Sequence, residues 1–202
     1  FPTQFWTAEL NENIEQLQKE AYLIRENDKD GVIKSNSGFQ GYHSKDIRDL
    51  NNLPGTNQLL KQIINAVNAI HQISRKGELQ LTNFWINISG KGSSNTPHTH
   101  SGLTYSGVFF IKVPKEMKGG RFLFYRNFNE ADFISTEYMG HFKEGYQMQG
   151  YDYPINTIKP KENMLVVFPA WVPHAVEINL SDEERISLSF NFKLNRTFSR
   201  GK

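Results

Sequence analysis

The 202-residue sequence contains no cysteine. Disulfide bonds are therefore excluded, and so are metal sites that depend on thiolate ligands. Any transition-metal site in this chain must use His, Asp or Glu side chains. The same absence is compatible with a reducing compartment, and we expect a cytoplasmic protein.

Long apolar runs and blocks of one charge are also missing. No segment approaches the roughly 18 to 20 consecutive apolar residues of a membrane-spanning helix, and no secretory signal peptide is visible. The formal net charge is +2, and Lys and Arg do not gather in blocks. We therefore expect no association with a membrane, and charge gives little support for binding of nucleic acid.

Hydrophobic and aromatic residues are plentiful. They make up 38% and 13% of the chain, the proportions of a globular protein. The length fits one domain with a substantial core, so we predict a single domain over residues 1–202. Within it, residues 1–78 are expected to form a helical support and residues 79–197 a core of strands.

Two helices are predicted in the first 78 residues. After Thr7, a candidate N-cap, apolar residues recur at helical spacing, at Leu10, Ile14, Leu17, Ala21 and Ile24. Residues 35–42, rich in Gly, Ser and Asn, indicate a loop. The second helix opens at Pro54 and ends before Gly77, and its apolar stripe comprises Leu59, Leu60, Ile63, Ile64, Val67 and Ile70. That stripe could serve an oligomer interface as easily as a core.

From residue 79 the pattern changes to that of short strands. Six are predicted, over residues 79–89, 106–113, 121–126, 164–169, 175–179 and 185–192. Two helices followed by many strands indicate helices packed on a β-sandwich or barrel. The connection 127–163 is long enough to carry structure or function, as an inserted hairpin, a packed surface loop or a lid over a substrate.

Three histidines have the spacing of a metal site. His98 and His100 are two positions apart, so in an extended chain both imidazoles point to one side and can reach one ion. His174 follows 74 positions later (174 − 100), at the junction of two predicted strands. Taken separately, the pair also fits two surface histidines, and His174 also fits a buried histidine against Trp171.

The last predicted strand alternates polar and apolar residues. Arg185, Ser187, Ser189 and Asn191 share one face, and the residues between them are apolar. If the polar face looks into a cavity, the guanidinium of Arg185 can bind a carboxylate with two hydrogen bonds, and Ser187 can donate to the same group. If that face meets water, the strand is an ordinary half-exposed one. The two interpretations predict opposite exposure for Ser187 and Ser189.

A distal histidine followed by R-x-S eleven positions later (185 − 174) resembles the Fe(II)/2-oxoglutarate-dependent oxygenase superfamily. The sequence is most similar to a branch of small bacterial and phage-type members. The resemblance covers most of the chain, and the segments that carry it are FPTQFW, SNSGFQGY, FWINISGKGSSNTPHTHSGLTYSGVFFIKVP, GGRFLF and MLVVFPAWVPHAVEINLSDEERISLSFNF.

This resemblance implies a double-stranded β-helix, a distorted jelly roll, with N-terminal helices supporting one sheet. It implies Fe(II) bound by His98, His100 and His174, and 2-oxoglutarate bound by Arg185 and Ser187. With O2, such an enzyme hydroxylates a substrate, here an unidentified small molecule or protein side chain, and releases succinate and CO2. Most members have Asp or Glu where this chain has His100, and a three-histidine set also suits zinc.

Two further residues are candidates for binding the co-substrate. Asn87 shares a strand face with Trp85 and Ser89, which could place it in the cavity, and Tyr105 opens the next strand. Ordinary strand packing is the alternative for both. The remaining histidines look incidental: His43, His71 and His141.

Two rival functions remain open. The three-histidine set favours a cupin-like metalloenzyme that works without 2-oxoglutarate, whereas the R-x-S sequence disfavours it. A jelly roll that binds a sugar or peptide without catalysis is the other alternative.

Overall fold

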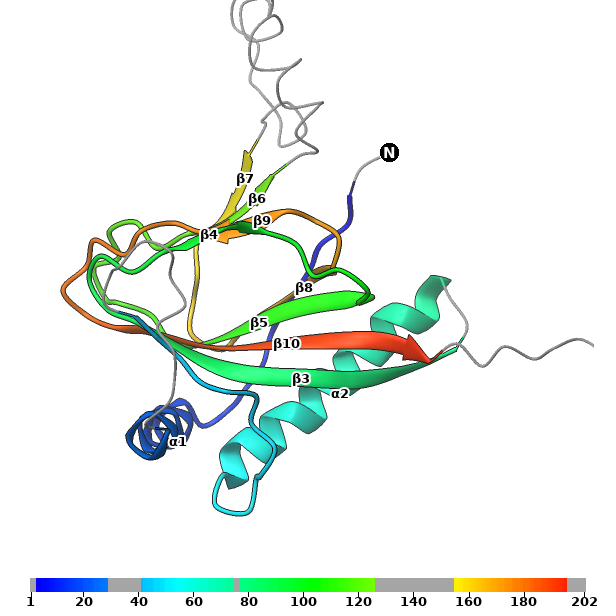
Figure 1. Cartoon of the computed structure of the whole chain (residues 1–202), viewed down its shortest axis with the longest axis horizontal. Coiled ribbons are helices and arrows are strands. Elements are labelled where there is room, and N and C mark those ends of the chain that lie inside the picture. Colours follow the sequence, from blue (N-terminus) through cyan, green and yellow to red (C-terminus); the bar gives the residue numbers. More distant parts are fainter. Residues whose placement is uncertain (1–2, 29–40, 75–76, 126–154, 196–202) are drawn as a thin grey trace, which may run out of the picture.

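The computed structural model describes residues 3–28, 41–74, 77–125 and 155–195 (Figure 1). Within these ranges it contains two helices and ten strands, and the strands form two sheets. The six-stranded sheet has the order β1 (Trp6–Glu9), β8 (Met164–Pro169), β5 (Tyr105–Lys112), β10 (Arg185–Asn195), β3 (Glu78–Ser89) and β2 (Gly41–His43). The four-stranded sheet has the order β4 (Asn95–His98), β9 (His174–Val176), β6 (Phe122–Tyr125) and β7 (Ile155–Ile158).

All strand pairs are antiparallel, and the large sheet separates two apolar cores. Both helices, α1 (Ile14–Asn27) and α2 (Pro54–Ser74), lie on one side of it, and the small sheet lies on the other (Figure 1). Ile186, Leu188 and Phe190 of β10 pack toward the helices, where the larger core is. Val108 and Phe110 of β5 face the small sheet and belong to the second core. This arrangement is the predicted helix-supported jelly roll.

Each helix begins where the sequence supplies an acceptor for its first N–H groups. The Asn13 side chain accepts from the Gln16 N–H and caps α1. The buried Glu20 carboxylate, on α1, accepts from the backbone N–H groups of Gly55 and Thr56, so it caps α2 and joins the two helices.

The first predicted helix began too early. Thr7 is not an N-cap but part of β1, where it pairs with Val166 of β8. The apolar stripe of α2 packs in the core of this chain: Leu59, Leu60, Ile63 and Val67 are fully or almost fully buried.

The six predicted strands are confirmed with small shifts at their ends, whereas β1, β2, β4 and β7 were not predicted. The last of these, β7, lies inside the expected connection 127–163 and pairs with β6. The rest of that connection up to residue 154, and the part of the predicted loop up to residue 40, lie outside the described residues. No described helix is long and apolar enough to cross a membrane.

Candidate functional site

A cavity of about 440 Å³ lies between the two sheets. The small sheet contributes His98 and His174 to its wall, and His100 follows directly after β4. The large sheet contributes the polar faces of its central strands, which are Asn83, Trp85, Asn87 and Ser89 of β3 and Arg185, Ser187, Ser189 and Asn191 of β10. Of the two interpretations of the polar face of β10, the structure therefore supports the one in which that face looks into the cavity.

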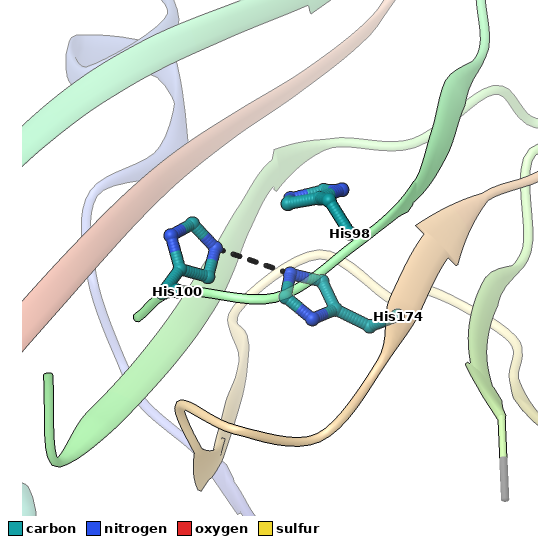
Figure 2. A group of neighbouring side chains, drawn as sticks. All are labelled: His98, His100 and His174. Carbon is teal, nitrogen blue, oxygen red and sulfur yellow. Dashed lines mark hydrogen bonds between the residues drawn. The ribbon is translucent and has the colours of Figure 1, made fainter. Parts of the chain in front are cut away.

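The three histidines line this cavity, and their rings come together (Figure 2). One ring nitrogen from each lies within 4.8 Å of the others. Register explains part of this: His98 of β4 is paired with His174 of β9. His100 is held by its backbone N–H, which donates to the carbonyl of Ala170 at 2.9 Å.

Backbone carbonyls select the tautomer of two of these rings. Nδ1 of His98 lies 2.8 Å from the carbonyl of Thr96, and Nδ1 of His174 lies 2.9 Å from that of Val172. A carbonyl can only accept, so each Nδ1 carries a proton and, in the neutral ring, the lone pair is on Nε2. For His174 that atom faces Nε2 of His100. Outer hydrogen bonds of this kind orient histidine ligands in metal sites.

The electrostatics also favour neutral imidazoles. Burial, with a smaller contribution from nearby His98, lowers the pKa of His100 to about 4. The same two causes, burial first, lower the pKa of His174 to about 3. At neutral pH both rings are therefore neutral and can offer a lone pair to a metal, and no described carboxylate belongs to the cluster.

The spacing of the rings fits one shared ion. Nε2 of His100 and Nε2 of His174 are 3.2 Å apart, the contact drawn in Figure 2. Two imidazole nitrogens at ~2.1 Å from one metal are separated by ~3.0 Å at a right angle and ~3.4 Å at a tetrahedral angle. The observed separation falls between these values, so His100 and His174 are spaced to share one divalent ion, with a ring nitrogen of His98 within 4.8 Å of both.

Arg185 is a buried cation that lines the same cavity. Arg185 is 4% exposed, and Cζ of its guanidinium lies 5.9 Å from the centroid of the Phe110 ring. One terminal nitrogen donates to the carbonyl of Gly120 at 3.1 Å, whereas Nε has no hydrogen-bond partner. Burial lowers the pKa of Arg185 to about 10, so the group stays charged at pH 7. A buried, charged and incompletely bonded guanidinium is suited to an anionic ligand such as a carboxylate.

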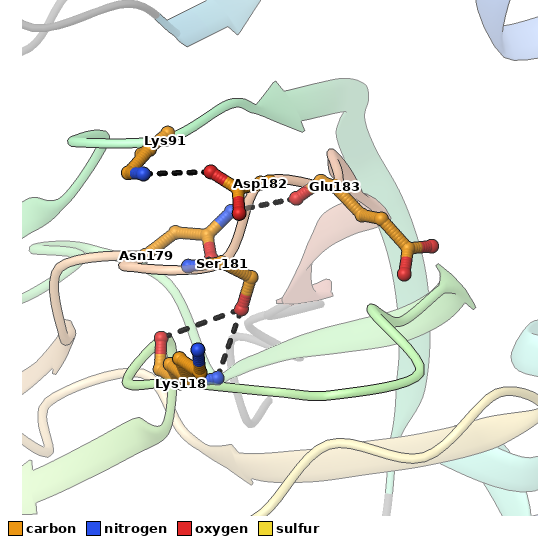
Figure 3. A network of polar contacts seen from close by, with 6 residues as sticks. All are labelled: Lys91, Lys118, Asn179, Ser181, Asp182 and Glu183. Atoms are coloured by element: carbon orange, nitrogen blue, oxygen red, sulfur yellow. Dashed lines mark hydrogen bonds and ion pairs between the residues drawn. The ribbon is translucent and has the colours of Figure 1, made fainter.

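A network of polar contacts supports the loop that holds Arg185 (Figure 3). The buried Asn179 side chain donates to the carbonyls of Ser89 and Glu183 and accepts from the N–H of Ser181. The Ser181 hydroxyl accepts from the N–H of Lys118. Because residues 118–120 run past this network, it fixes the carbonyl of Gly120 that Arg185 contacts.

The other predicted co-substrate residues separate into two groups. Ser187 is 2% exposed and faces the cavity, as does Asn87, whose amide donates to Ser189 at 3.0 Å. Tyr105 is buried on the opposite side of the large sheet, with its ring edge-on to Trp6 and His71. A side chain there cannot reach the cavity, because the sheet lies between them.

Several cavity residues were missed. His43 looked incidental in the sequence but lies on β2 and stacks on Trp85, with ring centroids 5.3 Å apart. Asp46 follows β2 and also lines the cavity, although no periodic pattern marks its segment. Asn83 lies on the cavity face of β3 that strand alternation identifies, so a signal for it was present in the sequence.

Comparison with solved structures shows the same fold in several proteins. A Pseudomonas putida prolyl-4-hydroxylase is 17% identical, with a TM-score of 0.61 over 95% of this chain and 93% of that one. The viral collagen prolyl hydroxylase vCPH from Paramecium Bursaria Chlorella virus-1, in its 2OG complex, is 10% identical, with a TM-score of 0.60 over 93% and 94%. HygX from Streptomyces hygroscopicus, solved with nickel and 2-oxoglutarate bound, is 10% identical, with a TM-score of 0.56 over 96% and 84%.

Sequence comparison identifies the family. Curated protein sequences give no match. Residues 83–191, more than half of the chain, match the model of a 2OG-Fe(II) oxygenase family. The match spans strands from both sheets and contains the three histidines, Arg185 and Ser187. The chain therefore belongs to the 2OG-Fe(II) oxygenase family and is a 2-oxoglutarate-dependent dioxygenase with Fe(II) and 2-oxoglutarate as its cofactors.

Proposed function

We propose that this enzyme hydroxylates an unidentified substrate, with Fe(II) held by His98, His100 and His174 and 2-oxoglutarate held by Arg185 and Ser187. The observation that carries the proposal is a single cavity containing both a cluster of neutral imidazoles and a buried guanidinium with an unpartnered Nε. The two ends of 2-oxoglutarate, a keto acid and a carboxylate, require these two kinds of partner.

The bound Fe(II) and 2-oxoglutarate supply the oxidising chemistry, in which O2 is consumed, the co-substrate becomes succinate and CO2, and a C–H bond of the substrate becomes C–OH. The protein's own residues position the co-substrate and shield it from water. Arg185 anchors one carboxylate by charge and two-point geometry, and the hydroxyl of Ser187, on the same face of β10, donates to it. Phe110 and the second core exclude water around the guanidinium.

The cluster differs from a site with one carboxylate ligand by one negative charge. Imidazole ligands carry no negative charge, so the three histidines would leave the full charge of the divalent ion uncompensated. The dianionic co-substrate then provides the compensating charge, so we expect the metal and 2-oxoglutarate to bind cooperatively.

We also propose that the described residues belong to one domain within 1–202. Residues from both helices and from the central strands share one core, so the N-terminal part supports the sheet that lines the cavity. The helical segment up to residue 78 would then be needed for a folded site.

Anaerobic titration tests the assignment of the residues. Adding 2-oxoglutarate to the Fe(II)-loaded protein should produce the weak visible charge-transfer band of a chelated keto acid, and admitting air should release succinate slowly without substrate. We expect His174→Ala to abolish the band and Arg185→Ala to raise the 2-oxoglutarate concentration needed for it.

Arg121→Ala is the matched control. Arg121 directly follows Gly120, which Arg185 contacts, but its side chain pairs with Glu177 at the surface, 2.6 Å away. It should leave the titration unchanged. An Arg185→Ala protein with the wild-type requirement for 2-oxoglutarate would show that another group binds the carboxylate. Tight Fe(II) binding without the charge-transfer band and without succinate release would contradict the binding of 2-oxoglutarate to the metal at this site.

A further inference from the structure

Beyond the metal cluster, the cavity has an end that the proposed cofactors do not use. On β10, Arg185 and Asn191 are six residues apart, which is roughly 20 Å along a strand. His100 lies beside the stretch between them: its ring centroid is 6.2 Å from that of Trp85, and Trp85 pairs with Ser189. If 2-oxoglutarate extends from the histidines to Arg185, the end near Asn191 is left for the substrate.

A chain of hydrogen bonds crosses this end from the interior to the surface. The buried Ser106 hydroxyl donates to Oδ1 of Asn191 at 2.6 Å, and Nδ2 of Asn191 donates to Oδ1 of Asn83 at 3.0 Å. Nδ2 of Asn83 then donates to Oδ1 of Asp46 at 3.1 Å. All four side chains line the cavity.

The direction of this chain is determined by its last member. An ionised carboxylate can only accept, so Asn83 must turn its NH2 group toward Asp46 and its carbonyl toward Asn191. Every donor in the chain therefore points toward Asp46. The remaining carboxylate oxygen, Oδ2, is left as the acceptor at the open end of the wall.

Backbone contacts hold Asp46 in place at this end. The N–H of Ser44 donates to the carbonyl of Ile86, and the N–H of Ile47 donates to that of Phe84, so the segment is tied to β3 on both sides of Asp46. The ion pairs between described residues do not include Asp46. Among the described residues that line the cavity, it is the only carboxylate. Trp85 adds a half-buried aromatic surface to the same wall.

We propose that Asp46, Asn83 and Trp85 form the substrate subsite and that it takes a cationic group, an ammonium or guanidinium, on the prime substrate. A carboxylate with a free oxygen beside an indole can stabilise such a group through charge and through the π face. This inference rests on the proposed function, since it places the subsite relative to the metal and 2-oxoglutarate. It narrows the substrates to amines and guanidines, whether small molecules or basic side chains.

Paramagnetic relaxation measures the binding of a simple probe near the metal. The full-length protein is loaded with Mn(II) and 2-oxoglutarate, and proton relaxation of n-butylammonium is compared with that of 1-butanol at equal concentration. We expect stronger enhancement for the ammonium ion. In Asp46→Asn it should fall roughly two- to fivefold, the effect of losing one charge pair at a partly exposed site.

Asp49→Asn is the matched control. Asp49 is an exposed aspartate on the same segment and lies outside the cavity lining, so this variant should behave like the wild type. Equal enhancement of both probes, no enhancement of either, or an ammonium enhancement that survives in Asp46→Asn would overturn the subsite. Water-proton relaxation separates this from failure of the metal assignment: if His174→Ala binds Mn(II) like the wild type, the proposed function fails, and the subsite with it.

Discussion

Replacing Arg185 by methionine should stabilise the protein without ligand and abolish its stabilisation by 2-oxoglutarate. Methionine keeps an unbranched apolar stem of similar length, so the packing against Phe110 is largely retained. What is removed is a buried charge that has a single hydrogen bond, to the carbonyl of Gly120, and an unpartnered Nε. Such a charge opposes folding until an anion binds beside it.

The size of the effect follows from the pKa of Arg185, which burial lowers to about 10. Each pH unit by which a pKa moves is worth about 1.4 kcal/mol, so the buried charge costs on the order of 3 kcal/mol. Because a lowered pKa on a base means that the folded state binds fewer protons, the cost is fully present at every pH below about 10 and is relieved only above it. The lost bond to Gly120 offsets about 1 kcal/mol. The net gain of about 2 kcal/mol corresponds to a rise in Tm of roughly 4–8 °C for a chain of this size.

Thermal unfolding of the Mn(II)-loaded protein at pH 7 measures both effects. At a 2-oxoglutarate concentration of about 100 Kd, the wild type should gain about 2.7 kcal/mol, and Arg185→Met should gain nothing. Arg121→Met is the control, since its exposed pair with Glu177 contributes at most about 1 kcal/mol. If Arg185→Met melted several degrees below the wild type and still responded to 2-oxoglutarate, the reasoning would be refuted.

Three further predictions concern the surroundings of the site. His100→Ala should weaken Fe(II) binding by more than the roughly 10–100-fold that loss of an outer-shell partner causes, as measured by metal titration; a smaller change would show that two histidines suffice. Asn179→Ala leaves the buried groups it bonds without partners, so urea unfolding should show a loss of about 1–3 kcal/mol. It should also raise the 2-oxoglutarate concentration for half-maximal succinate release, with Fe(II) affinity unchanged, because the carbonyl of Gly120 that Arg185 contacts is held less firmly. A purely structural role would leave that concentration unchanged. Ser187→Ala should raise the same concentration about fivefold, the loss of one hydrogen bond, whereas Tyr105→Phe should not change it, and a shift of equal size in both would contradict their placement on opposite sides of the sheet.

Local periodicity explains what the sequence could predict. Alternation over residues 185–192 placed Arg185, Ser187 and Asn191 on one face, because successive side chains of a strand point to opposite sides. The same rule brought His98 and His100 to one side, and the helical stripe of α2 identified the core face of that helix. Boundaries were less secure: the chain at Thr7 is a strand because it pairs with β8, a contact 159 positions away at Val166 (166 − 7).

Strand alternation shows which residues share a face of the sheet, but it does not show which way that face points. Alternation groups Tyr105 with Phe109 and Ile111, but only the pairing of β5 with β10, in which Tyr105 lies opposite Phe192, decides that this group faces the helices. The sequence by itself thus determined the helices, the central strands and the residue types of the proposed metal and carboxylate sites. The tertiary structure alone decided that Asp46 enters the cavity wall and that Arg185 is a buried charge with an unpartnered Nε, because both depend on contacts between segments far apart in the chain.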